Sequence, residues 1–420
     1  MSSPAPTTEA SGTGPGAAAR AATPRPTLRS RLFLPLIAVC TAATAANIYI
    51  AAPLLPLIAR DFGSTPSAVA WLASVAQFGY AAGLLFFAPL GDRVNRRRLV
   101  AVLTLAAAVA LVAGAATNGT YALAGAVLIA SAATVVPQLL VPLVAQRAPA
   151  HHRARHVAAV IAGLFTGIVA ARVAGGLAGQ AFGWRWVFLG AAALTAVLGL
   201  ATAAVLPRET PRHSGPLFAG LAALPGVLRH SPDLWRACVR QAGMYGAWSA
   251  MWTSLALLLT GGSAVDGYGM TTAAAGLFGL FGLTASVVAP LAGGLVDRFG
   301  AARVVRTAYG VAAVSVPLFW LGGQVMAALC AAAVLVHAAL VASHIANQTL
   351  ALTTTSAPAT ANTAYVVAGF AGGATASALA GTAFTHWGWG GVCAVAGAWL
   401  VLGWVTTSVP ARGSRAVTGV

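Results

Sequence analysis

Apolar residues fill the chain in long runs, and short polar stretches rich in arginine, glycine and proline separate these runs. Each run is about 20 residues or longer, the length that an α-helix needs to cross the hydrocarbon core of a bilayer. No alternating strand pattern appears, so the runs predict membrane-spanning helices. Twelve such runs lie at 32–59, 67–90, 98–116, 121–146, 157–182, 186–206, 237–260, 271–294, 304–322, 325–350, 363–385 and 391–409.

Composition excludes a soluble protein. Only 7% of the 420 residues are charged and 59% are hydrophobic, whereas a soluble domain carries about 25% charged residues. The net charge of +17 would suggest nucleic-acid binding in a soluble protein. Here every basic residue is an arginine and most lie in short loops, so we expect the lipid bilayer as a partner and no nucleic acid.

The arginines also predict the orientation of the chain. If the amino terminus is cytoplasmic, 21 of the 24 arginines fall on the cytoplasmic side, two lie outside (Arg60 and Arg185) and Arg172 lies within a helix. Positive charge is retained on the cytoplasmic side of membrane proteins. We therefore expect a multi-pass protein of the plasma (inner) membrane with both termini cytoplasmic, a disordered amino-terminal tail over 1–31 and a carboxy-terminal tail over 410–420.

Two landmarks repeat at one offset. Asp92 recurs as Asp297, and the Gly183-Trp184 pair recurs as Gly388-Trp389, in each case 205 residues later. A shared offset and a shared membrane side imply parallel repeats about an axis normal to the bilayer. The longest polar interruption, at 207–236, is the expected linker between two pseudo-symmetric six-helix halves at 32–206 and 237–409.

The two Asp-Arg loops resemble the loop motif of the major facilitator superfamily, Gly-x-Leu-x-Asp-Arg-x-Gly followed by basic residues. The second copy matches it with Gly293, Leu295, Asp297, Arg298, Gly300 and Arg303. The first copy keeps Leu90, Asp92, Arg93, Arg96 and Arg97, with Ala88 and Asn95 where glycines are usual. The resemblance extends from about residue 32 to 409. It implies an all-α integral membrane protein of twelve helices that functions as a monomer.

The resemblance also implies that these loops are conformational switches. A carboxylate at a helix amino terminus stabilises it by about 0.3–1 kcal/mol, and the implied partner of the Asp92 loop is the start of the eleventh helix. Asn362 and Thr363 are the expected cap there. Asn95 replaces a glycine at the tight turn and tolerates the left-handed conformation better than other residues. The alternative is that these loops only determine the membrane topology of the chain.

The fifth run carries a second family cue. Its glycines Gly167, Gly175 and Gly176 match the Gly-Pro-x-x-Gly-Gly region of drug:proton antiporters and predict close helix packing. Ala171 and Arg172 stand where that motif has Gly-Pro. The overall resemblance is therefore to the bacterial drug and metabolite efflux branch, with this one departure from its motif.

Ionisable residues inside the membrane are expensive to bury and are functional candidates by default. Arg172 lies in the middle of a predicted helix, where it would suit an anionic or carbonyl-bearing solute; alternatively it pairs with backbone carbonyls. All seven acids lie in the tail, loops or helix ends, so His337 and His344, seven residues apart on one helix face, are the candidates for proton coupling. Their alternative role is that of hydrogen-bonded core residues.

In the resembled fold, the first, fourth, seventh and tenth helices line the solute pathway. The candidates on them are Asn47, Tyr49, Gln138, Tyr245, Trp248, Trp252, His337, His344 and Asn347, with Gln77 and Tyr80 on the second helix as further candidates. Trp248 and Trp252 are four residues apart, so they offer one aromatic face.

These features predict a secondary active transporter that exports a small organic solute by alternating access, coupled to protons. A proton-independent facilitator or an importer of a metabolite is the alternative. A membrane enzyme or receptor is disfavoured, because no nucleophile elbow, metal-ligand cluster or carboxylate pair appears. We expect no catalytic residue, no cofactor and no metal.

Overall fold

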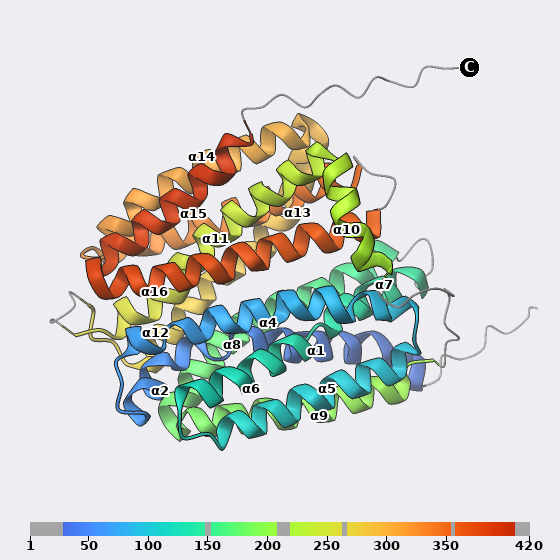
Figure 1. The fold of residues 1–420 in the computed structure, drawn as a ribbon, viewed down its shortest axis with the longest axis horizontal. Helices are drawn as coiled ribbons and strands as arrows, with labels where there is room; N and C mark the ends of the chain where they lie inside the picture. Colours follow the sequence, from blue (N-terminus) through green and yellow to red (C-terminus); the bar gives the residue numbers. More distant parts are fainter. Residues whose placement is uncertain (1–27, 148–152, 208–218, 263–266, 354–357, 408–420) are drawn as a thin grey trace, which may run out of the picture.

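The computed structural model describes residues 28–147, 153–207, 219–262, 267–353 and 358–407, and every regular element in them is a helix (Figure 1). The α-helices are α1 (Leu28–Tyr49), α2 (Leu55–Asp61), α3 (Pro66–Val69), α4 (Trp71–Phe87), α5 (Arg96–Ala115), α6 (Thr120–Ala133), α7 (Val136–Arg147), α8 (Arg153–Phe182), α9 (Trp184–Val205), α10 (Ala219–His230), α11 (Pro232–Thr260), α12 (Thr272–Leu277), α13 (Leu283–Phe299), α14 (Ala301–Leu321), α15 (Met326–Thr353) and α16 (Pro358–Val405). Short 3-10 turns are η1 (Ala52–Leu54), η2 (Pro89–Asp92) and η5 (Phe278–Gly282).

Within the described residues, ten helical stretches are long and apolar enough to cross a bilayer. One of the ten spans 360–405 and contains a break at Gly388, where φ is 59° and ψ is −152°. The 29-residue helix α11 is not among the ten. Its first half carries arginines and glutamine, and its second half includes tryptophan, serine and threonine beside the leucines. An all-helical membrane protein is thus what the hydropathy pattern predicted, while the number of twelve crossings stays a prediction.

The repeated Gly-Trp pair marks the same kind of turn twice. Gly183 separates α8 from α9 with φ 87°, and Gly388 breaks α16 with φ 59°. Only glycine adopts such angles without steric strain. The indole nitrogen of the following tryptophan is bonded each time: Trp184 donates to Asp61 at 3.2 Å and Trp389 to the Phe319 carbonyl at 2.5 Å. The sequence repeat therefore corresponds to a repeated backbone turn.

The helices gather in two groups that meet along one boundary (Figure 1). In the group drawn from blue to green, α1 packs on α8 and α9, α5 packs on α9 and α6, and α4 packs on α6. In the group from yellow-green to red, α11 packs on α16 and α15, and α14 packs on α15. The boundary is formed mainly where α4 meets α16 and where α8 meets α12.

The outward faces of the helices carry large exposed apolar side chains. Examples from five helices are Val109, Val197, Leu291, Val314 and Val401. In water an apolar surface this widespread would aggregate, whereas in a bilayer it contacts acyl chains. The buried side of the same helices holds the core, in which α11 is covered almost all round from Met244 to Leu259.

One local expectation was wrong. Asn362 does not cap a helix, because α16 already begins at Pro358 and Asn362 lies inside it, where its Oδ1 accepts a bond of 2.8 Å from Gln348 Nε2. Proline is favoured in the first helical turn, where its missing N–H costs nothing. The expected linker 207–236 includes one helix, α10, whose Leu224 and Leu228 pack on a small cluster around Leu234.

Candidate functional site

The side chain of Arg172 marks the boundary between the two groups of helices. It extends from α8 and is only 7% exposed. Its guanidinium carbon lies 5.3 Å from the ring centroid of Tyr49, 5.2 Å from that of Trp248 and 4.6 Å from that of Trp252. Tyr49 belongs to α1, whereas both tryptophans belong to α11 of the other group.

The guanidinium is a buried cation without a protein carboxylate. In the part of the chain that the structure describes, no hydrogen bond or ion pair reaches it, and Asp61 and Asp233 are paired with Arg185 and Arg236. A cation over an aromatic face gains about 0.5–2 kcal/mol. Removing a cation from water costs several kcal/mol. The three rings together offset about 1.5–6 kcal/mol of that cost, but an aromatic face accepts no conventional hydrogen bond from the guanidinium N–H groups.

His337 joins the aromatic side of this site. Its Nε2 accepts a hydrogen bond of 3.2 Å from the indole N–H of Trp248, and its Nδ1 lies 2.7 Å from the Ala333 carbonyl oxygen. The imidazole also meets the Trp252 ring edge-on, with centroids 4.4 Å apart at 90°. These two bonds assign a neutral ring with its proton on Nδ1. A second proton at Nε2 would face the indole N–H, so protonation requires Trp248 to move.

A tyrosine pair links the groups beside the arginine. The hydroxyls of Tyr49 and Tyr245 are 2.5 Å apart. The Tyr245 ring also packs on Phe370 of α16 at 5.0 Å, and Phe370 packs on Tyr80 of α4 at 4.5 Å. Tyr80 in turn accepts a bond of 3.4 Å from Gln138 Nε2. Aromatic contacts thus run from the Arg172 site to α4, across the same boundary.

A second polar cluster lies farther along this boundary. Gln77 of α4 donates 2.7 Å to Ser249 of α11 and 3.2 Å to Ser377 of α16. Ser249 returns a bond of 2.9 Å to Gln77 Oε1, and Thr253 lies 3.1 Å from Ser377. These four side chains, the Gln77 network, are fully buried and connect three helices.

Three of the predicted pathway residues lie away from Arg172. Asn47 donates 2.9 Å to Thr195 within the first group, and Asn347 donates 2.7 Å to the Ala237 carbonyl within the second. His344 packs against the Tyr365 ring, with centroids 5.5 Å apart. The structure thus separates His344 from His337, although both lie on one helix.

The loop residues lie apart from this site. The side chain of Asp92 is outside the described residues. Arg96 is buried and donates 2.7 Å to the Gly91 carbonyl and 3.3 Å to Gln146; Arg93 and Arg97 are half-buried. In the second copy Asp297, Arg298 and Arg303 are exposed.

The two loop copies turn differently. Asn95 has φ −62° and not the left-handed angle we considered, because its Oδ1 caps α5 by accepting 3.0 Å from the Arg97 N–H. Gly300, at the matching position, has φ 82° and provides no side-chain cap. The first copy therefore forms this turn with a side-chain hydrogen bond from asparagine, whereas the second copy uses a backbone conformation that favours glycine.

The predicted packing glycines contact three different segments. A Cβ on Gly167 would overlap the backbone of Ala42 in α1, and one on Gly175 would touch Pro53 at 3.4 Å. Gly176 faces Gly276 of α12, where a Cβ would come within 2.9 Å of the Gly276 Cα. Gly167 thus brings α8 close to its own group, whereas Gly176 brings it close to the other group.

Sequence reasoning missed Ser249, Thr253, Ser377, Gln241 and Tyr365. The hydroxyl of Tyr365 donates 2.6 Å to Gln241 Oε1 and thereby holds α16 on α11. Serine and threonine in a membrane helix often bond to their own backbone, so their presence carries little signal. Of these five residues, Gln241 could have been predicted from the sequence, because a side-chain amide in an apolar run needs a hydrogen-bond partner.

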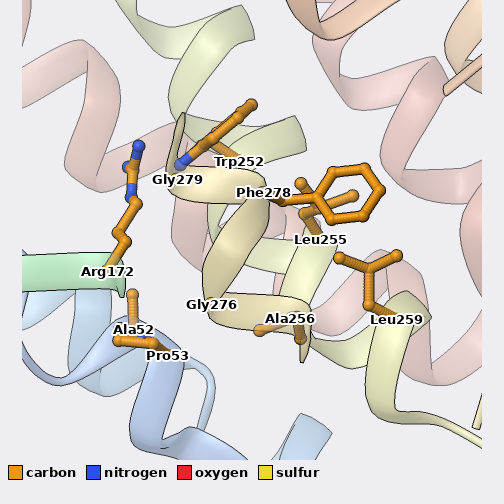
Figure 2. A pocket seen from close by; sticks show the side chains of 11 residues that line it. Ala52, Pro53, Arg172, Trp252, Leu255, Ala256, Leu259, Gly276, Phe278 and Gly279 are labelled. Atoms are coloured by element: carbon orange, nitrogen blue, oxygen red, sulfur yellow. The ribbon is translucent and has the colours of Figure 1, made fainter. Parts of the chain in front are cut away.

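The space beside Arg172 is small in this structure. Figure 2 shows Arg172 and Trp252 projecting toward one another from neighbouring helices, with Pro53, Gly276 and Leu259 around the cavity. Its volume is about 30 Å³, whereas sites for drug-sized ligands are clefts of about 300–1,000 Å³. A solute can therefore reach Arg172 only if the two groups of helices separate.

Comparisons with known proteins agree with this architecture. The model of the family described as the Major Facilitator Superfamily matches residues 37–377. A Streptomyces coelicolor protein described as a probable transporter is 80% identical over 98% of this chain and 93% of its own length. The uncharacterized transporter YgaY of Escherichia coli O157:H7 is 33% identical over 89% of this chain and 94% of its own.

Solved structures show the same fold. Two crystal structures of the nucleoside transporter NupG match this chain at 14% identity, with TM-scores of 0.70 and 0.68. The matches cover 90% and 88% of this chain, and 98% of NupG in both cases. An inward-facing, unoccupied bacterial homolog of the human lysosomal transporter Spinster has a TM-score of 0.61 at 16% identity, covering 90% of this chain and 94% of its own.

Proposed function

The chain belongs to the major facilitator superfamily of transporters, and on that premise we propose that it exports a small organic solute by alternating access. The solute binds at Arg172, where α1 and α8 of one group face α11 and α15 of the other. The observation that carries this proposal is the composition of the site from both groups. Any rocking of one group against the other opens or closes such a site.

The proposed transporter has twelve crossings in two halves, 32–206 and 237–409. The twelve follow if Gly388 divides α16 into two spans and α11 counts as a span despite its polar residues. Both termini and the two Asp-Arg loops lie on the cytoplasmic side, as the distribution of arginines favours. The loops at Asp92 and Asp297 bias which face of the site is open.

Proton coupling through His337 is our leading hypothesis. Its Nε2 is held by the Trp248 indole, and Trp248 also lies over Arg172. A proton arriving at Nε2 displaces that indole and so alters the aromatic wall of the solute site. His344 has no such connection to Arg172 in the structure, and it serves as a matched control.

Proton-independent facilitation is the second candidate, favoured by one observation. Both ring nitrogens of His337 are already engaged in hydrogen bonds, and no acid of the described residues lies at the Arg172 site. In this case the site binds and releases solute without titrating any group. NupG is a nucleoside transporter, so uridine belongs among the solutes to be tried.

The test is flux in proteoliposomes that hold the purified full-length chain. Radiolabelled benzoate, uridine and tetraphenylphosphonium serve as an anionic, a neutral and a cationic probe, with the pH gradient and the membrane potential imposed separately. We expect flux of one class that depends on the pH gradient, with the dependence lost in His337→Gln and kept in His344→Gln. Flux that ignores the pH gradient selects facilitation. Absence of protein-dependent flux for every class refutes the transport proposal.

A further inference from the structure

We infer that the solute is an organic anion whose carboxylate pairs with Arg172 while its apolar body lies against Trp248, Trp252 and Tyr49. This inference rests on the proposed function, because it names the solute class of the same site. It goes further in excluding neutral and cationic solutes as the main cargo. The first argument is charge balance at Arg172.

No acid among the described residues neutralises the charge of Arg172. It is 93% buried, since only 7% of it is exposed, and it has three aromatic neighbours but no hydrogen-bond acceptor among the described residues. A guanidinium has five N–H donors in a planar fork that matches a carboxylate in two parallel bonds. A neutral carbonyl would satisfy some of these donors but would leave the charge. A protonated amine would add a second positive charge.

The other side chains around the guanidinium also fit an anion. The neutral His337 has its acceptor nitrogen occupied by Trp248, so it presents no negative charge to the site. The Tyr49 and Tyr245 hydroxyls are bonded to each other, and the ring of Tyr49 lies 5.3 Å from the guanidinium carbon. A carboxylate that enters can take a bond from either hydroxyl. The site therefore offers donors and aromatic faces, and among the described side chains around Arg172 it lacks a competing acid.

The aromatic side chains of the site indicate the shape of the apolar part of the solute. The rings of Trp248 and Trp252 are nearly parallel, with 6° between their planes and centroids 6.3 Å apart. Flat apolar groups pack well on such faces. Figure 2 shows the end of the Arg172 side chain beside Trp252, and the guanidinium carbon lies 4.6 Å from that ring, so a carboxylate and a ring in one small molecule reach both. Aryl and indolyl carboxylates have this combination.

The experiment compares each acid with its own amide, which has nearly the same shape but no charge. Benzoate, cinnamate and indole-3-acetate are titrated against benzamide, cinnamamide and indole-3-acetamide, with tryptophan fluorescence of the purified full-length chain as the readout. We expect at least one acid to bind about tenfold or more tightly than its amide, because hydrogen bonds to charged groups are the stronger ones. Equal binding of every acid and amide, or binding of none, overturns the inference.

Arg172→Gln tests whether the preference comes from this residue. We expect the acid preference to disappear in Arg172→Gln and to persist, weakened, in Arg172→Lys. Arg185→Gln is the matched control, because the Arg185 guanidinium also lies over an indole ring, at 4.4 Å from Trp184, but its side chain is 34% exposed and paired with Asp61. A preference that survives in Arg172→Gln, or that disappears in Arg185→Gln to the same extent, overturns the inference.

A folding readout separates a binding role from a structural role. An unpaired buried cation destabilises the empty protein, so Arg172→Gln is expected to raise Tm without ligand and to lose the stabilisation by acids. If Arg172 were a structural anchor, the same change would lower Tm. An acid that binds at Arg172 but is not carried leaves this inference standing and refutes the transport proposal. A neutral solute that the unaltered chain and Arg172→Gln carry equally well overturns this inference and leaves the transport proposal standing.

Discussion

Gly176 of α8 faces Gly276 of α12, and its replacement by alanine is predicted to open the end of the molecule that this contact seals. A Cβ at Gly176 would lie 2.8 Å from the Thr272 carbonyl oxygen and 2.9 Å from the Gly276 Cα. Both are backbone atoms, so no side chain can rotate away. The reciprocal Cβ at Gly276 would lie 2.7 Å from the Arg172 carbonyl oxygen.

The magnitude follows from this overlap. An extra methyl group in a well-packed contact costs about 1–3 kcal/mol. If α8 and α12 touch only in the closed arrangement, this cost falls on that arrangement alone. The ratio of open to closed molecules then rises about 5- to 150-fold. Gly190 of α9 provides the control, because nothing lies within 4 Å of a Cβ built there.

The assay is the rate of thiol labelling by a membrane-impermeant maleimide. Leu259 lines the cavity beside Arg172 and is 1% exposed, so the thiol of Leu259→Cys reacts only when that end opens. The four native cysteines are replaced by alanine beforehand. We expect Gly176→Ala to raise the labelling rate about fivefold or more, and Gly190→Ala to leave it unchanged. An unchanged rate in Gly176→Ala refutes the reasoning that this contact closes the site.

Four further predictions follow from the described contacts. Arg185 donates a hydrogen bond to Asp61 and thereby holds the pKa of the Asp61 carboxyl below its usual range. Asp61→Asn should therefore slightly lower Tm at pH 7. This difference in Tm should vanish as the pH falls below about 3.9 and through the lowered pKa of Asp61. Gln77→Leu should remove the bonds that join three helices, lowering Tm and raising solvent access to the boundary by hydrogen exchange. Gly388→Ala should lower thermal stability by about 1–3 kcal/mol, measured by unfolding, because φ is 59° there. An inside-negative potential should speed benzoate export even without a pH gradient, because each exported benzoate carries one negative charge out of the negative compartment; proteoliposome flux that ignores the potential would contradict this.

The helices and their order were predictable, because burying backbone in lipid leaves few choices. The run 157–182 became α8 (Arg153–Phe182), and the repeated Gly-Trp pair became two turns with positive φ. In both cases the signal is local: apolar length for the helix, and glycine beside tryptophan for the turn. The membership in a transporter family followed from such local signals combined over the whole chain.

The composition of the site was predictable only in part. Arg172, Trp248, Trp252 and His337 were candidates from sequence, and the structure brings them together. Asn347 was an equally good candidate on polarity, yet it bonds inside its own group. Polarity identifies a residue that needs a partner, but helix rotation and tilt decide which partner it meets, and these are determined by packing against neighbouring helices.

By itself the sequence determined that this chain crosses a membrane as helices, which side its arginines favour, and that its two parts share one pattern. These are consequences of transfer energies, which act on each residue separately. Only the tertiary structure decided that Arg172 lies against three aromatic rings, with no acid of the described residues beside it. It also decided that Gly176 contacts Gly276. Such contacts join residues that are distant in the chain, and their energies depend on the packing of the helices that carry them.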